Sequence, residues 1–182
     1  MVMTNEIVNV VASTQLTESL DLYDVADIME KDYEAEQFPG LTYRVENPKV
    51  CVLLFRSGKA VATGAKSIDD IHAAFATVHS ELSEAGFDLW EYKDVSEMTE
   101  VQNLVVTHNY GQSLDLSELI ITMPFDKTEY EPEVFPGLIY RIDDPKSVCL
   151  VFSSGKCVIT GCKSMDEADE ATTHLIDELD LL

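Results

Sequence analysis

Basic residues are scarce in this chain, and features that define several common protein classes are missing. Lys and Arg together number 12, against 34 Asp and Glu. No apolar run approaches the roughly 18 residues that a membrane-spanning helix needs, and no basic leader precedes a cleavable apolar stretch. Neither membrane insertion nor export is therefore indicated, and we expect a cytoplasmic protein.

The four cysteines and four histidines give no sign of a metal or redox site. Cys51, Cys149, Cys157 and Cys162 lie in or beside β-branched runs, without a C-x-x-C pair or a His at metal-ligand spacing. We predict that they are reduced strand or core residues and that the protein needs no cofactor. An enzyme is not expected either, because the sequence shows no paired acid and base and no constellation of residues around a nucleophile.

The formal charge of -22 over 182 residues is extreme for a chain that is 46% apolar and long enough to bury one core or two small ones. Such self-repulsion destabilises the compact state at low salt. Because the acid is spread along the chain, a solvated acidic surface in a salt-rich cytoplasm is favoured over an acidic interaction tail.

The chain contains an internal sequence repeat. "YEAEQFPGLTYRVENPKVCVLLFRSGKAVATGAKS" at 33–67 and "YEPEVFPGLIYRIDDPKSVCLVFSSGKCVITGCKS" at 130–164 share 21 of 35 positions at an offset of 97. Earlier, "IVNVVAST" at 7–14 matches "VQNLVVTH" at 101–108 at an offset of 94. The second half therefore has three extra residues before Tyr130. Two copies indicate pseudo-twofold symmetry rather than a solenoid, with repeats at 1–90 and 91–182.

Each repeat shows one order of predicted elements. A period-two strand comes first, then a helical stretch near 17–30, then three strands at 40–46, 50–55 and 59–65. A long helix follows, with Ser67 or Ser164 as the N-cap. This order predicts an α+β fold, an antiparallel sheet with its helices on one face.

The few cations gather on the predicted strands. Residues 38–66 have a net charge of +4 and residues 135–163 a net charge of +2, which leaves -28 for the rest. Nine of the twelve basic residues fall in these two blocks. Two basic surfaces related by symmetry favour a polyanion with its own dyad, such as duplex DNA, over a small phosphate ligand.

The motifs "NVVAS", "YEPEVFPGLIYR", "PK", "FSSGK" and "TGCKS", each with its counterpart in the other half, resemble the TATA-box-binding protein family of archaea and eukaryotes. The acidity resembles that of a version from a salt-loving archaeon. The resemblance implies a ten-stranded antiparallel, saddle-shaped sheet with helices on the convex face. This family is itself the established example of apolar wedging in the minor groove, and the resemblance implies that the protein binds and bends the TATA element in that way.

The resemblance also assigns residues. It implies phenylalanine wedges at Phe38, Phe55, Phe135 and Phe152. It implies a minor-groove floor made by Asn9, Val11, Leu53, Val61, Thr63, Asn103, Val105, Leu150, Val158 and Thr160. It implies phosphate contacts by Arg44, Lys49, Lys59, Lys66, Arg141, Lys146, Lys156 and Lys163. Such a floor fits A·T pairs, because a G·C pair adds an amino group that an apolar surface excludes.

The implied partners are promoter DNA, transcription factor B and, indirectly, RNA polymerase. By resemblance, transcription factor B docks on Glu131, Glu133 and Val134, and the protein is a general initiation factor associated with the nucleoid. Two alternatives stay open at this point. One is a paralogue serving a subset of promoters, and the other is a module that uses the duplicated sheet to bind an acidic protein or a metabolite.

Overall fold

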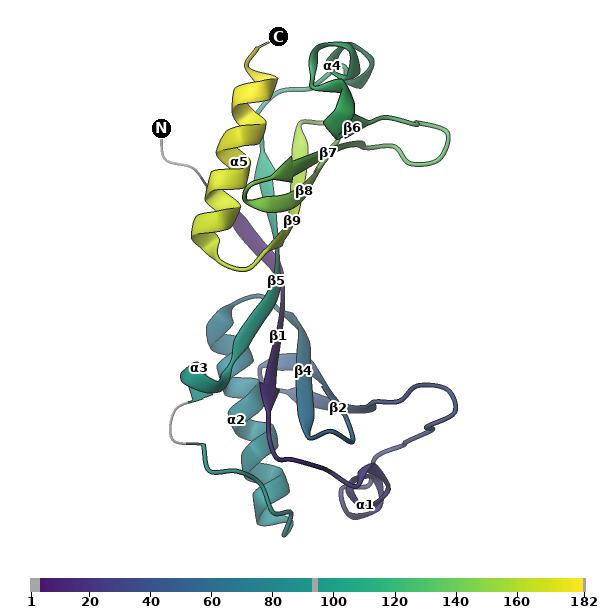
Figure 1. Ribbon diagram of the computed structural model, residues 1–182, viewed down its shortest axis with the longest axis vertical. Helices are drawn as coiled ribbons and strands as arrows, with labels where there is room; N and C mark the ends of the chain where they lie inside the picture. Colours follow the sequence, from purple (N-terminus) through teal and green to yellow (C-terminus); the bar gives the residue numbers. More distant parts are fainter. Residues whose placement is uncertain (1–3, 93–94, 182) are drawn as a thin grey trace. The chain divides into compact units, whose positions relative to one another are not determined.

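The computed structural model describes residues 4–92 and 95–181 of the chain (Figure 1). Its first elements are β1 (Glu6–Gln15), α1 (Leu22–Ile28), β2 (Leu41–Glu46), β3 (Lys49–Leu54), β4 (Lys59–Ala65), α2 (Ile68–Glu84) and α3 (Val95–Met98). Then follow β5 (Glu100–Asn109), α4 (Leu116–Thr122), the 3-10 helix η1 (Phe125–Lys127), β6 (Thr128–Glu129), β7 (Leu138–Asp143), β8 (Lys146–Val151), β9 (Lys156–Cys162) and α5 (Met165–Leu179). The α+β class and the antiparallel pairing predicted from the sequence are confirmed.

The chain forms two compact units that exchange the starts of two strands. Unit 2 is Asn9–Gln102, and unit 1 combines Asn103–Leu182 with Met1–Val8. The first residues of β1 thus belong to unit 1, where Asn5 donates to Asp169 and Thr172 of α5. The first residues of β5 belong to unit 2, where Gln102 donates to Ser13. The repeats 1–90 and 91–182 describe the duplicated sequence, and this division stays a prediction.

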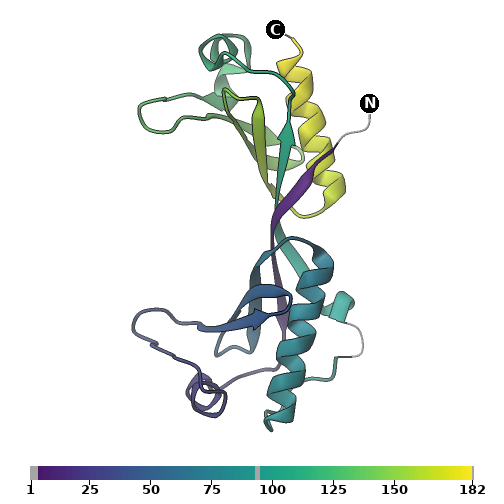
Figure 2. The same cartoon turned by 180° about the vertical axis from the view of Figure 1, so that it is seen from behind.

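Unit 2 is a four-stranded sheet, in the order β2-β3-β4-β1, whose one face is covered by α2 (Figures 1 and 2). Alternate strand residues such as Tyr43, Val52 and Ala62 are buried there. They meet the buried apolar side chains of α2, which include Ile71 and Phe75. Burying one large apolar side chain stabilises the folded state by about 1.5–3 kcal/mol, so this layer is the main source of stability in the unit.

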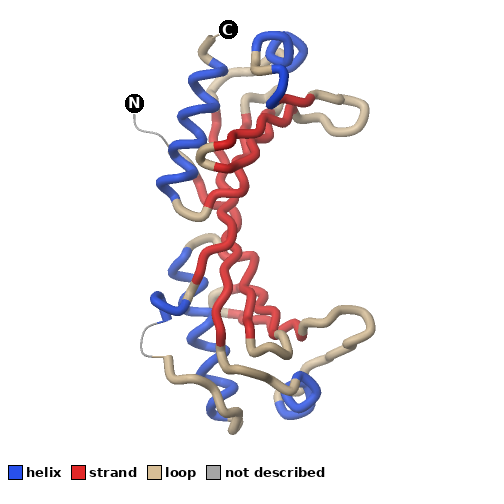
Figure 3. Tube along the Cα trace, in the orientation of Figure 1, coloured by secondary structure: helices blue, strands red, loops and turns tan. Residues whose placement is uncertain are grey.

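Unit 1 repeats the arrangement with one more strand. Its sheet runs β5-β9-β8-β7-β6, and α5 covers the corresponding face (Figure 3). Leu138, Ile159 and Leu175 are completely buried between the layers. Cys149, Cys157 and Cys162 are buried in the same core, and all four cysteines are free. The prediction that these thiols are core or strand residues is confirmed.

The described residues form nine strands, and the tenth predicted strand is missing from unit 2 for a local reason. In unit 1, β6 pairs with β7 through Thr128 opposite Tyr140. The matching position in unit 2 is Lys31, whose backbone N–H instead donates to Ala26 O at 2.8 Å. Glu30, at φ 55, turns the chain there and closes α1. The segment after α1 thus bonds back to α1, no strand pairs with the outer side of β2 among the described residues, and β2 is an edge strand.

The turns and helix ends follow the sequence signals. Ser67 accepts from Asp70 N and Ser164 from Glu167 N, as expected of N-caps. Gly58 lies at φ 80 in the β3–β4 turn, and a Cβ there would be 2.0 Å from Thr17 O. This position therefore tolerates glycine alone. In the described part of the chain, no helix has the length and apolar character needed to cross a membrane.

Candidate nucleic-acid interface

The helix-free face of unit 2 brings the predicted floor residues together. Because strand residues alternate between the two faces, the half-buried side chains that do not meet α2 share this surface. Leu53 lies opposite Val61, and Cys51 opposite Thr63. Asn9 and Val11 flank buried Val10 on β1 and are half-buried as well. The predicted floor of this half is therefore one continuous apolar surface with few polar groups.

Unit 1 presents the same surface from equivalent positions. Leu150 lies opposite Val158, and Val148 opposite Thr160. Asn103 and Val105 lie on β5, on either side of buried Leu104. The register also places side chains on these faces that the sequence analysis did not name, which are Ser13, Thr42 and Cys51 in unit 2 and Thr107, Ile139 and Val148 in unit 1. The pairing of neighbouring strands, which period-two patterns alone do not supply, reveals them.

The four predicted wedge residues form two matching pairs. Phe38 and Phe55 meet edge to face, with ring centroids 6.2 Å apart, and Phe135 and Phe152 do the same at 5.9 Å. Phe38 keeps 45% of its surface exposed. The other three rings are half-buried and do not belong to the core beneath the sheet.

A glycine makes each ring pair possible. A Cβ on Gly40 would lie 2.8 Å from Cε1 of Phe38 and 3.0 Å from Cε1 of Phe55. Gly137 stands in the same relation to Phe135 and Phe152. Both rings of a pair thus rest on bare backbone, which keeps them at the end of the strand and outside the core.

The eight predicted phosphate-contacting cations are exposed around the two faces. Lys49 and Lys146 begin β3 and β8, Lys59 and Lys156 begin β4 and β9, and Lys66 and Lys163 follow β4 and β9. Arg44 and Arg141 project from the middle of β2 and β7. Arg141 lies 3.5 Å from Glu129 of β6. Arg44, which has no such strand beside it, forms no ion pair within the described residues.

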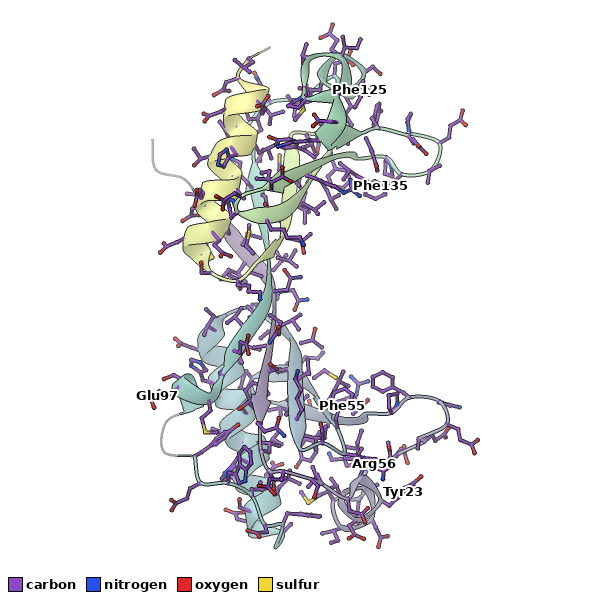
Figure 4. All side chains as sticks on the ribbon, in the orientation of Figure 1. Tyr23, Phe55, Arg56, Glu97, Phe125 and Phe135 are labelled. Carbon is purple, nitrogen blue, oxygen red and sulfur yellow. The ribbon has the colours of Figure 1, made fainter. Side chains whose placement is uncertain are left out.

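Three further predicted residues, Glu131, Glu133 and Val134, lie on the long loop between β6 and β7 (Figure 3). All three are exposed, and Val134 keeps 80% of its surface in solvent. The N–H groups of Val134 and Phe135 both donate to Glu131 O at 2.9 Å, which folds the loop into a turn. Figure 4 shows Phe135 beside this loop, whereas Phe125 lies next to α4.

Unit 2 also has a hollow between β2 and α2. It measures about 800 Å³ and is lined mainly by polar side chains of the segment 30–32, β2 and α2. Tyr43 donates to Glu81 there, and burial, with this carboxylate second, raises the pKa of the phenol. Within residues 4–92 and 95–181, no group of three or more His, Cys, Asp or Glu side chains is arranged to hold a metal.

The chain is similar to known proteins over nearly its whole length. The family described as "Transcription factor TFIID (or TATA-binding protein, TBP)" matches residues 4–85 and 98–182. TATA-box-binding protein 2 of Haloferax volcanii is 47% identical, over 97% of this chain and 94% of that protein. The TATA-box-binding protein of Methanocaldococcus jannaschii is 46% identical, over 96% and 92%.

A solved structure extends this likeness to three dimensions. The structure described as Methanococcus jannaschii TBP matches with a TM-score of 0.88 at 45% identity, covering 98% of this chain and 99% of that one. Family and structure agree over nearly the whole sequence, so this chain belongs to the TATA-binding protein family.

Proposed function

We propose that this protein is a general transcription initiation factor that binds the TATA element in the minor groove, bends it, and recruits transcription factor B and RNA polymerase. One observation supports the proposal above the others. Each unit presents a helix-free face with an apolar floor, an Asn and a Thr, two phenylalanines at its end and four cations around it. In a chain whose net charge is -22, cations gathered around these faces favour a polyanion as the ligand, and the duplication favours one with twofold symmetry.

The chemistry of the floor favours A·T pairs. In the minor groove A·T and T·A offer acceptors only, whereas G·C adds an amino donor. Valine and leucine side chains leave that donor without a partner, while the donors of Asn and Thr match the acceptors. The floor assigned to DNA contact therefore consists of Asn9, Val11, Leu53, Val61, Thr63, Asn103, Val105, Leu150, Val158 and Thr160.

The phenylalanine pairs are proposed to act as wedges. An aromatic ring inserted at a flexible TA step replaces part of the lost stacking, and the resulting bend brings more protein surface into contact. In this proposal the two helix-free faces form the concave side of a saddle, with α2 and α5 on the convex side. The surrounding lysines and arginines neutralise phosphates and do not read sequence.

The loop bearing Glu131, Glu133 and Val134 is proposed to dock transcription factor B. Exposed carboxylates beside an exposed valine suit a basic partner surface with an apolar centre. The acidic exterior fits work in the salt-rich cytoplasm of a halophilic archaeon, at the nucleoid. The relatives are binding proteins by name, which agrees with a factor that performs no catalysis.

The test is DNA bending by energy transfer between dyes on the two ends of a TATA duplex, in molar KCl. Phe135→Ala and Phe152→Ala should each abolish most of the bend, because unstacking costs a few kcal/mol per kinked step that the ring must offset. Phe125→Ala is the control, since Phe125 is 93% exposed and lies in η1, away from the face. Circular dichroism should show all three variants folded.

Two results would count against the proposal. Full bending by both face variants would remove the wedge role. A native protein that neither binds nor bends the duplex would favour the interaction module that binds an acidic protein or a metabolite.

A further inference from the structure

A bulge occurs at the same place in both helix-free faces. Val10 pairs with Ala65 and Ala12 with Ala62, so Val11 of β1 faces two residues of β4, Thr63 and Gly64. In unit 1 the shift falls between Leu104 and Val106 of β5. Gly64 has φ +89 and Gly161 φ +100, a region open to glycine. The same bulge thus lies beside the proposed DNA-binding floor in both units, which suggests that it contributes to binding.

The bulge directs a backbone N–H at each floor asparagine. Gly64 N donates to Asn9 Oδ1 at 2.8 Å, and Gly161 N donates to Asn103 Oδ1 at 2.7 Å. A strand without a bulge would use these N–H groups in the ladder. Here each N–H donates instead to an asparagine side chain of the neighbouring strand. The carbonyl oxygen of that side-chain amide is therefore held by the protein.

This bond removes an ambiguity that every free asparagine has. The amide offers a donor at one end and an acceptor at the other, and rotation by 180° exchanges them at almost no cost in shape. A freely rotating Asn would donate to the acceptors of an A·T pair, yet it would also turn and accept from the amino group of guanine. An anchored Asn presents only its N–H groups, so it has no favourable partner in that amino group.

We propose that the N–H groups of Gly64 and Gly161 are positioning groups that fix Asn9 and Asn103 as donors and thereby make the surface reject G·C pairs. The inference rests on the proposed binding to the minor groove and adds the origin of its selectivity. The glycines themselves touch no base in this account. They act through the asparagines.

In unit 1 the donor is extended to a second group. Asn103 Nδ2 lies 3.1 Å from Thr160 Oγ1 and donates to it. The hydroxyl then accepts from the amide and can turn its own hydrogen to the groove, so that Thr160 also becomes a donor. In this structure the hydroxyl donates that hydrogen to Asn103 Oδ1 at 3.4 Å, a long and weak bond that it would exchange for an acceptor in the groove. Asn9 forms no corresponding bond to Thr63 within the described residues.

The experiment removes one hydrogen atom at a time. In the full-length chain, the amide N–H of residue 64 or 161 is replaced by an ester oxygen through incorporation of glycolic acid. Residue 111 receives the same change as the control, because Gly111 N donates to Asn109 Oδ1 at 2.9 Å at φ +94, in a turn outside the floor. Binding is measured in molar KCl on TATA duplexes with one central pair changed to G·C or to inosine·C.

Inosine lacks the amino group of guanine and is otherwise identical at both groove edges. The dissociation constant for the G·C duplex divided by that for the inosine·C duplex therefore reports on that amino group alone. The esters at 64 and 161 should reduce this ratio roughly fivefold or more while affinity for the A·T duplex changes less. The ester at 111 should leave the ratio unchanged. The ester at 64 should have no further effect in an Asn9→Ala background.

Several outcomes would overturn the inference. One is an unchanged ratio of dissociation constants in the esters at both 64 and 161. Another is a change of the same size in the ester at 111. A third is a change of the same size when the ester at 64 is made in the Asn9→Ala background. If an ester protein does not fold, hydrogen exchange of the Gly64 and Gly161 amides in the native complex decides, and fast exchange there rejects the anchor. Failure of the native protein to bind any duplex would reject the proposed function instead.

Discussion

The thiols of Cys149 and Cys157 show how the fold changes the acidity of single residues. Burial raises the pKa of Cys149 to about 12, with nearby Cys157 contributing, and raises the pKa of Cys157 to about 11. A thiol in an unfolded chain titrates near about 8.5. The folded state therefore holds these two protons more tightly than the unfolded state.

This difference predicts the order of alkylation and the effect of pH on stability. At pH 8, Cys51, which is half-buried, should react first with iodoacetamide, and Cys149 and Cys157 only after unfolding, because the thiolate is the reactive form. Above about pH 8.5 the unfolded state loses protons that the folded state keeps, so the free energy of unfolding should fall. Mass spectrometry of labelled peptides and urea titrations at pH 7 and 10 test both points. Equal labelling of all four cysteines in the native protein would contradict them.

At the scale of elements, the two long loops offer a matched comparison. Glu133 lies on the loop before β7, and Glu36 occupies the equivalent place before β2. Glu133→Arg should weaken the complex of protein, TATA duplex and transcription factor B while sparing binding to the duplex, because a reversed charge repels a basic docking surface. Glu36→Arg should leave both complexes intact. A gel shift with and without transcription factor B measures this, and equal loss in the two variants would reject the docking loop.

The sequence predicted most elements because their signals are local. Alternating residues define β2, β3 and β4, and Ser67 marks the start of α2. The absent strand in unit 2 was not predictable in this way. It depends on how α1 ends, where Glu30 has a positive φ and the N–H of Lys31 donates to Ala26 O, and no local sequence signal marks this geometry.

The candidate site was predictable to a similar extent. The family resemblance carried by the repeated motifs assigned Phe38, Phe55 and the floor residues, and the strand register and ring contact show which of them lie side by side. The bonds to Asn9 and Asn103 could not be read from the sequence, because they join strands 55 and 58 residues apart through a bulge. The ion pair of Arg141 with Glu129 likewise requires β6.

At the scale of the whole molecule, the charge governs binding. The affinity of an ordinary DNA-binding protein falls steeply as the salt concentration rises. Binding releases counterions from the phosphates, and added salt opposes that release. Here the rest of the chain repels DNA, and at molar salt, where the Debye length is about 3 Å, that distant repulsion is screened while close contacts persist. The slope of log K against log[KCl] should therefore be shallow or positive in the molar range, and the fold should loosen at low salt.

Replacing acids near the face should restore ordinary behaviour. Glu46→Gln with Asp144→Asn removes two exposed charges close to the proposed phosphate contacts and should turn the slope downward. Glu170→Gln with Asp177→Asn removes two from α5 and should change it less. Fluorescence anisotropy over a KCl series measures the slope, with circular dichroism as the check on folding. A steep negative slope in the folded native protein would refute this account.

The exchange of strand starts between the units also has a consequence for synthesis on the ribosome. Unit 2 is one uninterrupted segment, Asn9–Gln102, and can fold as soon as it has emerged. Unit 1 includes residues 1–8, which are made before unit 2, and residues 103–182, which are made after it. At roughly 5–20 residues per second, synthesis of the 174 residues from 9 to 182 takes on the order of 9–35 s, and the amino-terminal segment waits that long for its partner to be complete. The unit that contains residues 1–8 is thus completed after the unit that follows them in the sequence.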